Sequence, residues 1–218
     1  MSIITIERKI LAKNDEVAEA NRRRFQDAAT FVFNIVSSPG AGKTSLLERT
    51  LEVLKDSLRV AVIEGDVQTD FDARRVSRYG VPVVQIVTNG GCHLEARLVQ
   101  DAIGSLDLRS LDMVVIENVG NLVCPANYDL GEAFKVVVLS TTEGDDKPLK
   151  YPGMFRNASV LVVNKTDLLP YVDCDLGRLR RNATEINPAL TIFETSCRTG
   201  DGITEWTDWL QTQVRRRP

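Results

Sequence analysis

Seven short apolar runs, separated by Gly, Pro, Asn or Asp, are the feature of this sequence that most constrains its fold. The runs lie at 31–36, 59–63, 81–87, 113–116, 135–139, 160–163 and 191–193. Most are apolar at successive positions rather than at alternate ones, which is typical of strands that are buried on both faces of a sheet. The runs therefore predict a parallel sheet in the interior of an α/β domain.

Segments with a helical spacing of apolar residues lie between several of these runs, at 45–55, 94–103, 175–186 and 203–214. Alternating strands and helices favour a mainly parallel sheet flanked by helices, with ligands at the carboxyl ends of the strands. We predict one three-layer α/β domain over residues 31–218. Residues 1–30 have a weaker amphipathic pattern, which predicts an N-terminal helical extension that packs on the outside of this domain.

The composition limits the partners and the compartment. The 218 residues include 27 Lys and Arg against 30 Asp and Glu, so the formal net charge is −3. This balance provides no global positive field that would attract nucleic acid. No apolar run approaches the roughly 20 residues that a membrane-spanning helix needs, and the first residues do not look like a signal peptide. We therefore expect a cytoplasmic protein without membrane insertion, whose four cysteines stay reduced.

A phosphate-binding loop is predicted at Ser37-Ser-Pro-Gly-Ala-Gly-Lys-Thr44, between a predicted strand and a predicted helix. Its glycines let the backbone approach phosphates closely, with the amides pointing inward. Lys43 adds positive charge beside the β- and γ-phosphates, and the Thr44 hydroxyl is a ligand for Mg²⁺. Ser37 replaces the glycine that usually begins this pattern. The fold expected is thus that of a P-loop NTPase, and the predicted contacts of the loop are Pro39, Gly40, Ala41, Gly42, Lys43, Thr44 and Ser45.

A second motif, Asn164-Lys-Thr-Asp167, follows the run 160–163 and is predicted to contact the nucleotide base. The Asp167 carboxylate would accept hydrogen bonds from N1–H and the 2-amino group of guanine, which adenine lacks. Asn164 would brace the loop, and the stem of Lys165 would cover one face of the base. Ser196 and Cys197 are candidate contacts to guanine O6 through backbone amides. The motif alone is equally consistent with a surface turn, and the phosphate loop upstream favours a site for GTP or GDP.

Acidic residues follow two of the predicted strands. Glu117-Asn-Val-Gly120 is similar to the D-x-x-G turn of GTPases, so Glu117 would hold Mg²⁺ through water and the Gly120 amide would contact the γ-phosphate. Asp66 ends the second strand and would lie at the metal edge of the site. Capping of a helix or loop is the alternative for both acids. Asn121 stands where a water-orienting glutamine is usual, so we expect slow hydrolysis until Asp66, Asp72 or a partner completes the site.

Cys92, His93 and Cys124 form a candidate site for a second metal. Cys92-His93 follows Asn89-Gly-Gly91, and Cys124 lies just past Gly120. Two thiols and an imidazole suit Zn²⁺ and also bind Ni²⁺. Three ligands leave the coordination incomplete, so a second subunit, a water or another metal carrier must supply the rest. Burial of the thiols without a metal role is the alternative.

Together these segments resemble the HypB family, the nickel-insertion GTPases of hydrogenase maturation. The segments are Ser38-Pro-Gly-Ala-Gly-Lys-Thr44, Cys92-His93, Glu117-Asn-Val-Gly-Asn-Leu-Val-Cys-Pro125, Thr142-Glu-Gly-Asp-Asp-Lys-Pro-Leu-Lys-Tyr-Pro152 and Asn164-Lys-Thr-Asp167. The resemblance runs from about residue 31 to the C-terminus. It places the chain in the SIMIBI class of P-loop GTPases, with the sister urease accessory GTPase as the nearest alternative.

The resemblance implies a slow, Mg²⁺-dependent GTPase that forms a homodimer around GTP, with Lys150 as a contact across the interface. It implies nickel or zinc binding by Cys92, His93 and Cys124. It also implies delivery of nickel to the precursor of a hydrogenase large subunit, with a small zinc-binding accessory protein as partner. Many members carry an N-terminal C-x-x-C-G-C motif or a histidine-rich segment, and residues 1–30 contain neither cysteine nor histidine. A GTPase switch without metal cargo and a non-catalytic metal-binding module are the alternatives of other classes.

Overall fold

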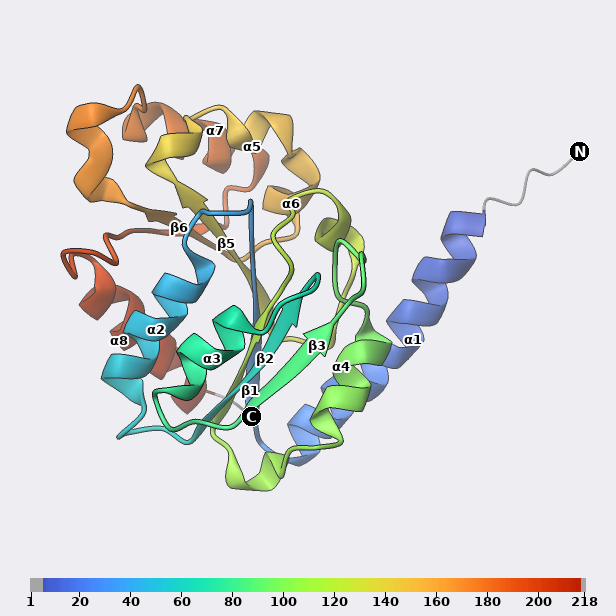
Figure 1. Cartoon of the computed structure of the whole chain (residues 1–218). Helices are drawn as coiled ribbons and strands as arrows, with labels where there is room; N and C mark the ends of the chain where they lie inside the picture. The colour runs from blue at the N-terminus through green and yellow to red at the C-terminus, as the bar shows by residue number, and fades with distance from the viewer. Residues whose placement is uncertain (1–5, 217–218) are drawn as a thin grey trace, which may run out of the picture.

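A seven-stranded parallel sheet forms the centre of the computed structural model, which describes residues 6–216 (Figure 1). The strands are β1 Phe31–Ser37, β2 Val60–Asp66, β3 Val83–Val87, β4 Met113–Glu117, β5 Phe134–Ser140, β6 Val160–Asn164 and β7 Thr191–Glu194. Their spatial order is β3-β2-β4-β1-β5-β6-β7, and each neighbouring pair is parallel. The prediction of strands at the seven apolar runs is confirmed, and the described sheet is parallel throughout.

Helices connect the strands. The α-helices are α1 Ile6–Asp27, α2 Lys43–Leu54, α3 Phe71–Ser77, α4 Ala96–Ile103, α5 Lys147–Lys150, α6 Pro152–Arg156, α7 Leu176–Ile186 and α8 Ile203–Arg215. Short 3-10 turns lie at η1 Leu108–Ser110, η2 Cys124–Asn127, η3 Thr141–Glu143 and η4 Thr166–Tyr171. Helices α2, α4, α7 and α8 match the four segments with helical spacing. Helices α3, α5 and α6 were not predicted, because each is too short to show a repeating apolar face. No described helix is both long and apolar enough to cross a bilayer.

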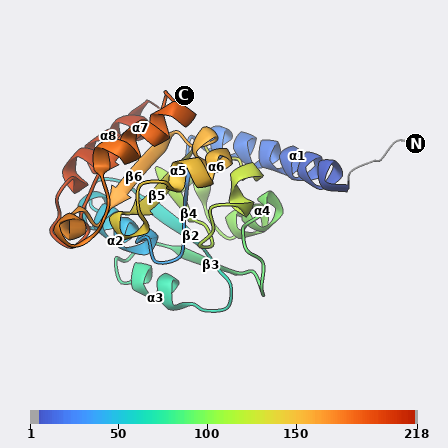
Figure 2. The same cartoon turned by 90° about the horizontal axis from the view of Figure 1, so that it is seen from above.

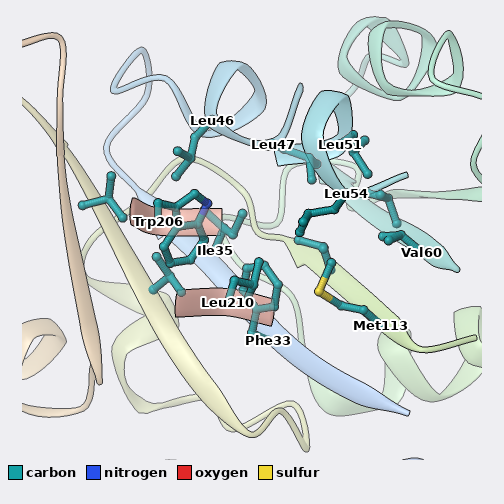
Figure 3. Packing of buried hydrophobic residues seen from close by; sticks show 14 of the residues in the cluster. Phe33, Ile35, Leu46, Leu47, Leu51, Leu54, Val60, Met113, Trp206 and Leu210 are labelled. Atoms are coloured by element: carbon teal, nitrogen blue, oxygen red, sulfur yellow. The ribbon is translucent and has the colours of Figure 1, made fainter. Parts of the chain in front are cut away.

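One face of the sheet carries the largest part of the core. Leu46, Leu47, Leu51 and Leu54 of α2 and Trp206 and Leu210 of α8 pack on Phe33 and Ile35 of β1 (Figure 3). The indole N–H of Trp206 donates a hydrogen bond to the Thr50 hydroxyl at 2.9 Å, so this buried polar atom is satisfied. The packing fixes α2 against β1, and thereby fixes the loop that joins them.

Two groups of helices cover the other face. Helices α1 and α4 pack over β1, β2 and β4 through residues such as Phe25, Val99 and Ile103. Helices α6 and α7 pack over β5 and β6. Helix α1 lies alongside α4 in the outer layer and extends past it (Figures 1 and 2). In the predicted extension the chain is helical from Ile6 to Asp27, and residues 1–5 and 217–218 lie outside the described chain.

The parallel arrangement brings the predicted motifs to one edge of the sheet. Strands β1, β2, β4 and β6 end at Ser37, Asp66, Glu117 and Asn164. The loops that follow these ends carry the phosphate-binding motif, both acidic segments and the base motif. Their meeting follows from the strand order, because β2, β4, β1, β5 and β6 are neighbours in the sheet.

Candidate functional site

The predicted phosphate loop connects β1 to α2 and has the backbone that its glycines favour. Gly40 and Gly42 have φ angles of 77° and 103°, a region that residues with a Cβ rarely adopt. A Cβ at Gly42 would lie 2.4 Å from Asn164 Nδ2, so the close packing there also requires glycine. Ser37 is fully buried, and its hydroxyl accepts a hydrogen bond from Lys43 Nζ at 3.1 Å. The serine at the first glycine position thus fits the turn and holds the lysine at the mouth of the loop.

A pocket of about 470 Å³ lies over this loop. Its lining includes Lys43, Thr44, Asp66, Asp72 and Gly120, so the structure brings the predicted phosphate and Mg²⁺ residues together. Lysine and loop amides at the amino end of α2 make this a site for an anion.

Glu117 contacts the phosphate pocket through Thr44, which lines it: the Thr44 hydroxyl donates a 2.7 Å hydrogen bond to Glu117 Oε1. Glu64 is paired with Glu117 across β2 and β4, and both carboxyls are nearly inaccessible to solvent. Burial, with repulsion from Glu117, raises the pKa of Glu64 to about 10. Burial likewise raises the pKa of Glu117, while Lys43 opposes the shift. One oxygen of each carboxyl is buried without a hydrogen-bond partner among the described residues. Sequence reasoning did not select Glu64, because only the strand register shows that it adjoins Glu117.

Asp66 and Asp72, the other two acids at this pocket, each contact a residue close to them in the sequence. Asp66 Oδ1 accepts hydrogen bonds from the amides of Gln68 and Thr69 at 2.8 and 2.6 Å. These bonds lower the Asp66 pKa against the opposing effect of burial. Asp72 forms an ion pair with Arg75 at 3.1 Å. Asp66 therefore caps a loop, as the alternative interpretation expected, and it also lines the pocket.

The base motif lines a neighbouring pocket of about 560 Å³. Asn164 braces two loops, because its Nδ2 donates to the Ala41 carbonyl at 3.1 Å and its Oδ1 accepts from the Cys197 amide at 3.3 Å. Asp167 Oδ1 accepts a 2.6 Å hydrogen bond from the Ser196 hydroxyl, which orients the carboxylate. The pocket is lined by Asn164, Lys165, Asp167, Cys197, Gly42 and Ser45 among others. The two predicted base-contact segments therefore meet beside the phosphate loop.

Two further predicted residues have contacts that sequence reasoning did not anticipate. Lys165 Nζ donates a hydrogen bond to the Gly40 carbonyl at 2.7 Å, and its backbone is left-handed with φ 64°. The side chain thus lies across the phosphate loop at the junction of both pockets. Lys150 is exposed and forms an ion pair with Asp146 at 2.6 Å. Burial raises the pKa of the Cys197 thiol to about 11, so the thiol stays protonated at neutral pH, and the residue packs against the core.

The predicted soft-metal ligands also converge, although they come from loops after different strands. The Cys92 sulfur lies 3.0 Å from the Cys124 sulfur and 3.6 Å from His93 Nδ1. The ligand atoms of all three residues lie within 4.8 Å of one another. His93 packs on Tyr128 with ring centroids 4.0 Å apart, and its Nε2 is buried without a hydrogen-bond partner among the described residues.

The electrostatics of this cluster suit a metal. Burial lowers the pKa of His93, which favours the neutral imidazole that binds metals. The pKa of Cys92 is raised chiefly by its hydrogen bond with Cys124. A divalent cation would replace the shared thiol proton and favour both thiolates.

Comparison with known proteins places this arrangement in a family. The family described as "CobW/HypB/UreG, nucleotide-binding domain" matches residues 31–194. The hydrogenase maturation factor HypB of Azotobacter vinelandii is 53% identical over 211 residues, which cover 97% of this chain and 70% of that protein. The chain belongs to the HypB family of hydrogenase maturation factors. The resemblance seen in the motifs is thereby confirmed, and the chain is a member of a P-loop GTPase family.

Solved HypB structures share the fold. The crystal structure of HypB from Helicobacter pylori in complex with nickel is 37% identical, with a TM-score of 0.89, and the match covers 93% of this chain and 95% of that one. HypB from Archaeoglobus fulgidus is 38% identical, with a TM-score of 0.87 and coverage of 93% and 99%. The predicted three-layer P-loop fold is confirmed.

In this HypB-family chain, the nucleotide loop and the soft-metal cluster are joined through the turn at 117–121. A Cβ on Gly120 would lie 3.1 Å from the Pro39 Cα, so the turn packs directly on the phosphate loop. Asn118 Oδ1 accepts a hydrogen bond from the Leu94 amide at 3.1 Å. Asn121 Nδ2 donates to the Cys92 carbonyl at 3.2 Å. The two asparagines therefore hold the backbone on both sides of His93.

Sequence reasoning missed both bridges. It treated Asn121 only as a residue in the place of a glutamine, and it gave Asn118 no role. The signal was present in the Glu117–Pro125 segment, whose two asparagines flank Gly120. Their partners lie 24 and 29 residues away in the chain, however, so the partners could not be assigned without the fold.

Proposed function

We propose that this chain is a GTP-hydrolysing switch that carries nickel or zinc and takes part in nickel insertion into a [NiFe]-hydrogenase. The observation that carries the proposal is the convergence of Cys92, His93 and Cys124 next to a turn that packs on the phosphate loop. The complex of Helicobacter pylori HypB with nickel supports a cargo of this kind.

Guanine recognition rests on Asp167. The Ser196 hydroxyl already fills one lone pair of its Oδ1, which points the carboxylate into the pocket beside Asn164 and Lys165. The remaining acceptor sites suit the two donors on the guanine edge, whereas adenine would leave them unpaired.

Hydrolysis rests on the phosphate pocket. Thr44 and Glu117 fit Mg²⁺, because the Thr44 hydroxyl contacts one oxygen of the Glu117 carboxyl and the other oxygen is buried without a hydrogen-bond partner among the described residues; Asp66 contributes through its second oxygen. When bound, Mg²⁺ offsets the charge that develops on the transferred phosphate. Lys43 stabilises the γ-phosphate, and Asp72 or Asp66 accepts a hydrogen bond from the attacking water. Intrinsic turnover is slow, because Asn121 is engaged with the metal loop.

The active form is a homodimer that closes around GTP. Three cysteine and histidine ligands from one chain leave room for further ligands, and a second subunit supplies them most directly. Exposed Lys150, held only by a surface ion pair, is available to reach across the interface. Closure would exclude water and add positive charge near the γ-phosphate. The partners proposed are a small zinc-binding accessory protein and the hydrogenase large-subunit precursor in the cytoplasm.

Metal titration tests this proposal. Purified wild type, Cys92→Ala, His93→Ala and Cys124→Ala are titrated with nickel and zinc in the presence of GDP or a non-hydrolysable GTP analogue with Mg²⁺. We expect the three variants to lose metal while GTP binding is kept, and Cys174→Ala to bind metal like wild type. Lys43→Ala is the nucleotide control. Unchanged metal stoichiometry and affinity in the Cys92 and Cys124 variants would leave a GTPase switch whose cysteines have no metal role.

A further inference from the structure

Helix α1 contacts both loops that carry the soft-metal ligands, although it lies outside the matched family domain at 31–194. Asn14 Oδ1 accepts a hydrogen bond from the Ala96 amide at 2.9 Å, and its Nδ2 donates to the Asp129 carbonyl at 2.8 Å. Asn21 Nδ2 donates to the carbonyls of Ala96 and Leu130 at 2.8 and 3.1 Å. Each asparagine therefore bridges the start of α4 and the segment 129–130.

These two attachment points are the ends of the metal loops. Ala96 is the first residue of α4 and follows His93 by three positions. Asp129 lies just after η2, the turn that begins at Cys124, and adjoins Tyr128. The Tyr128 ring packs on the His93 imidazole. The two ligand loops are thus linked near the ligands by the Cys92–Cys124 contact and the asparagine bridges described above, and at their far ends by α1.

The chemistry of this contact exceeds what packing of a helix requires. Apolar residues such as Ala18 and Phe25 already bury the inner face of α1. Asn14 and Asn21, with 7% and 0% exposure, bury amides in the same face, which is costly unless the amides are hydrogen-bonded. Seven positions separate them, about two helical turns, so both point to the same side. The Arg22 guanidinium adds an ion pair to Asp129 at 2.6 Å.

We propose that α1 is a structural part of the metal site, in which Asn14 and Asn21 are positioning residues that fix the spacing between the Cys92-His93 loop and the Cys124 loop. This inference rests on the proposed metal site. The helix holds the two loops at a separation that lets three ligand atoms meet before metal binds, so less order is imposed by binding itself. Groups hydrogen-bonded directly to metal ligands change metal affinity by about 10- to 100-fold when they are removed, and because these bonds are made one step further from the ligands we expect the lower end of that range.

Two substitutions of Asn14 test the positioning role. Asn14→Asp keeps an acceptor for the Ala96 amide and places negative charge at the start of α4, which is favourable there, but it cannot donate to the Asp129 carbonyl. Asn14→Ala removes both bonds. We expect both variants to bind nickel and zinc about tenfold more weakly than wild type and to bind the GTP analogue within twofold of wild type. Both variants should unfold at a lower temperature than wild type, because each loses the bond to the Asp129 carbonyl and Asn14→Asp also buries a carboxylate against that carbonyl; a control variant of lowered stability is therefore needed.

Thr30→Val is the matched control, because it removes a buried 2.7 Å hydrogen bond to the Leu108 carbonyl just beyond the other end of α1. It should lower thermal stability and leave metal affinity unchanged. The inference is overturned if Asn14→Asp binds metal like wild type, because bridging by Asn14 then has no role. It is also overturned if Thr30→Val weakens metal binding as much as Asn14→Asp does, because general destabilisation then explains the effect. The Cys92→Ala variant distinguishes these results from failure of the proposed function: if it too binds metal normally, the metal site itself is wrong.

Discussion

Coupling between nucleotide state and metal affinity can be tested by removing one hydrogen bond. The Asn121 amide joins the turn that packs on the phosphate loop to the Cys92 carbonyl. Any shift of Gly120 toward a γ-phosphate would therefore move the backbone beside two metal ligands. We predict that the metal affinity of wild type differs between the GDP and GTP-analogue states, and that Asn121→Ala reduces this difference.

The expected size follows from the single bond. A neutral hydrogen bond contributes about 0.5–1.5 kcal/mol, which corresponds to about a 2- to 13-fold change in an equilibrium constant. Removal of this bond can reduce the coupling factor by no more than that. Asn118 makes a second bridge from a position that is 1% exposed, so part of the coupling should survive in Asn121→Ala. Asn121 is the better site for substitution, because it is only half-buried and the fold depends on it less.

The assay is a thermodynamic cycle. Nickel is titrated calorimetrically into wild type and Asn121→Ala, each with GDP or a GTP analogue, at one fixed protein concentration. By linkage, the factor by which the GTP analogue, relative to GDP, changes metal affinity must equal the factor by which metal changes the affinity for the GTP analogue relative to GDP. Asn187→Ala is the control, because its amide bonds the carbonyls of Phe155 and Ala158 at a loop away from both sites. Equal coupling factors in wild type and Asn121→Ala, or coupling lost equally in Asn187→Ala, would refute this route.

Three further predictions concern the base, the interface and the buried acids. Asp167→Asn should weaken GTP by roughly a hundredfold or more and improve binding of xanthosine triphosphate in fluorescence titrations; equal binding of ATP and GTP by wild type would contradict guanine recognition. Wild type should form a dimer in light scattering with GTP analogue and Mg²⁺, and Lys150→Ala should abolish that dimer; a monomeric wild type under these conditions would contradict the proposed interface. Glu64 has a folded-state pKa of about 10, raised chiefly by burial and then by Glu117. The folded protein therefore keeps the Glu64 proton between pH about 4.5 and 10, whereas the unfolded chain loses it, so the free energy of unfolding falls as pH rises through this range. This fall amounts to at most ~1.4 kcal/mol per pH unit, and Glu64→Gln should remove it in urea titrations at pH 6–9.

The sheet was predictable because its strands are buried on both faces, which leaves continuous apolar runs in the sequence. The seven runs therefore located β1 to β7 without knowledge of their order. The order itself depends on right-handed connections and on packing, which single runs do not encode. Helices α5 and α6 span only four and five residues, and so they lacked a detectable period.

The site was predictable where the chemistry lies in one contiguous loop. The phosphate loop and the base motif are each a single contiguous segment, and the structure places both at the expected edge of the sheet. The convergence of the candidate metal ligands could also be anticipated, because cysteine and histidine are rare in this chain and Cys92-His93 is an adjacent pair. Contacts made by ordinary residues across large separations were not found: Asn14 meets Asp129 across 115 positions, and Glu64 meets Glu117 through strand register. An isolated asparagine or glutamate in the sequence carries no indication of such a partner.

Asn121 belongs to a motif that the sequence reveals and makes a long-range contact that only the structure reveals. In the sequence, Asn121 stands in place of the glutamine that usually orients the attacking water, and the structure shows which groups Asn121 contacts instead. Asn121 Nδ2 is engaged by the Cys92 carbonyl, and its Oδ1 accepts a hydrogen bond from the Val123 amide at 2.8 Å, so both ends of the side chain are occupied. A side chain held in this way cannot turn toward water at the γ-phosphate without releasing the metal loop. We therefore propose that slow hydrolysis and nucleotide-dependent metal affinity are two consequences of one pair of hydrogen bonds, and we expect any change that frees Asn121 to affect both.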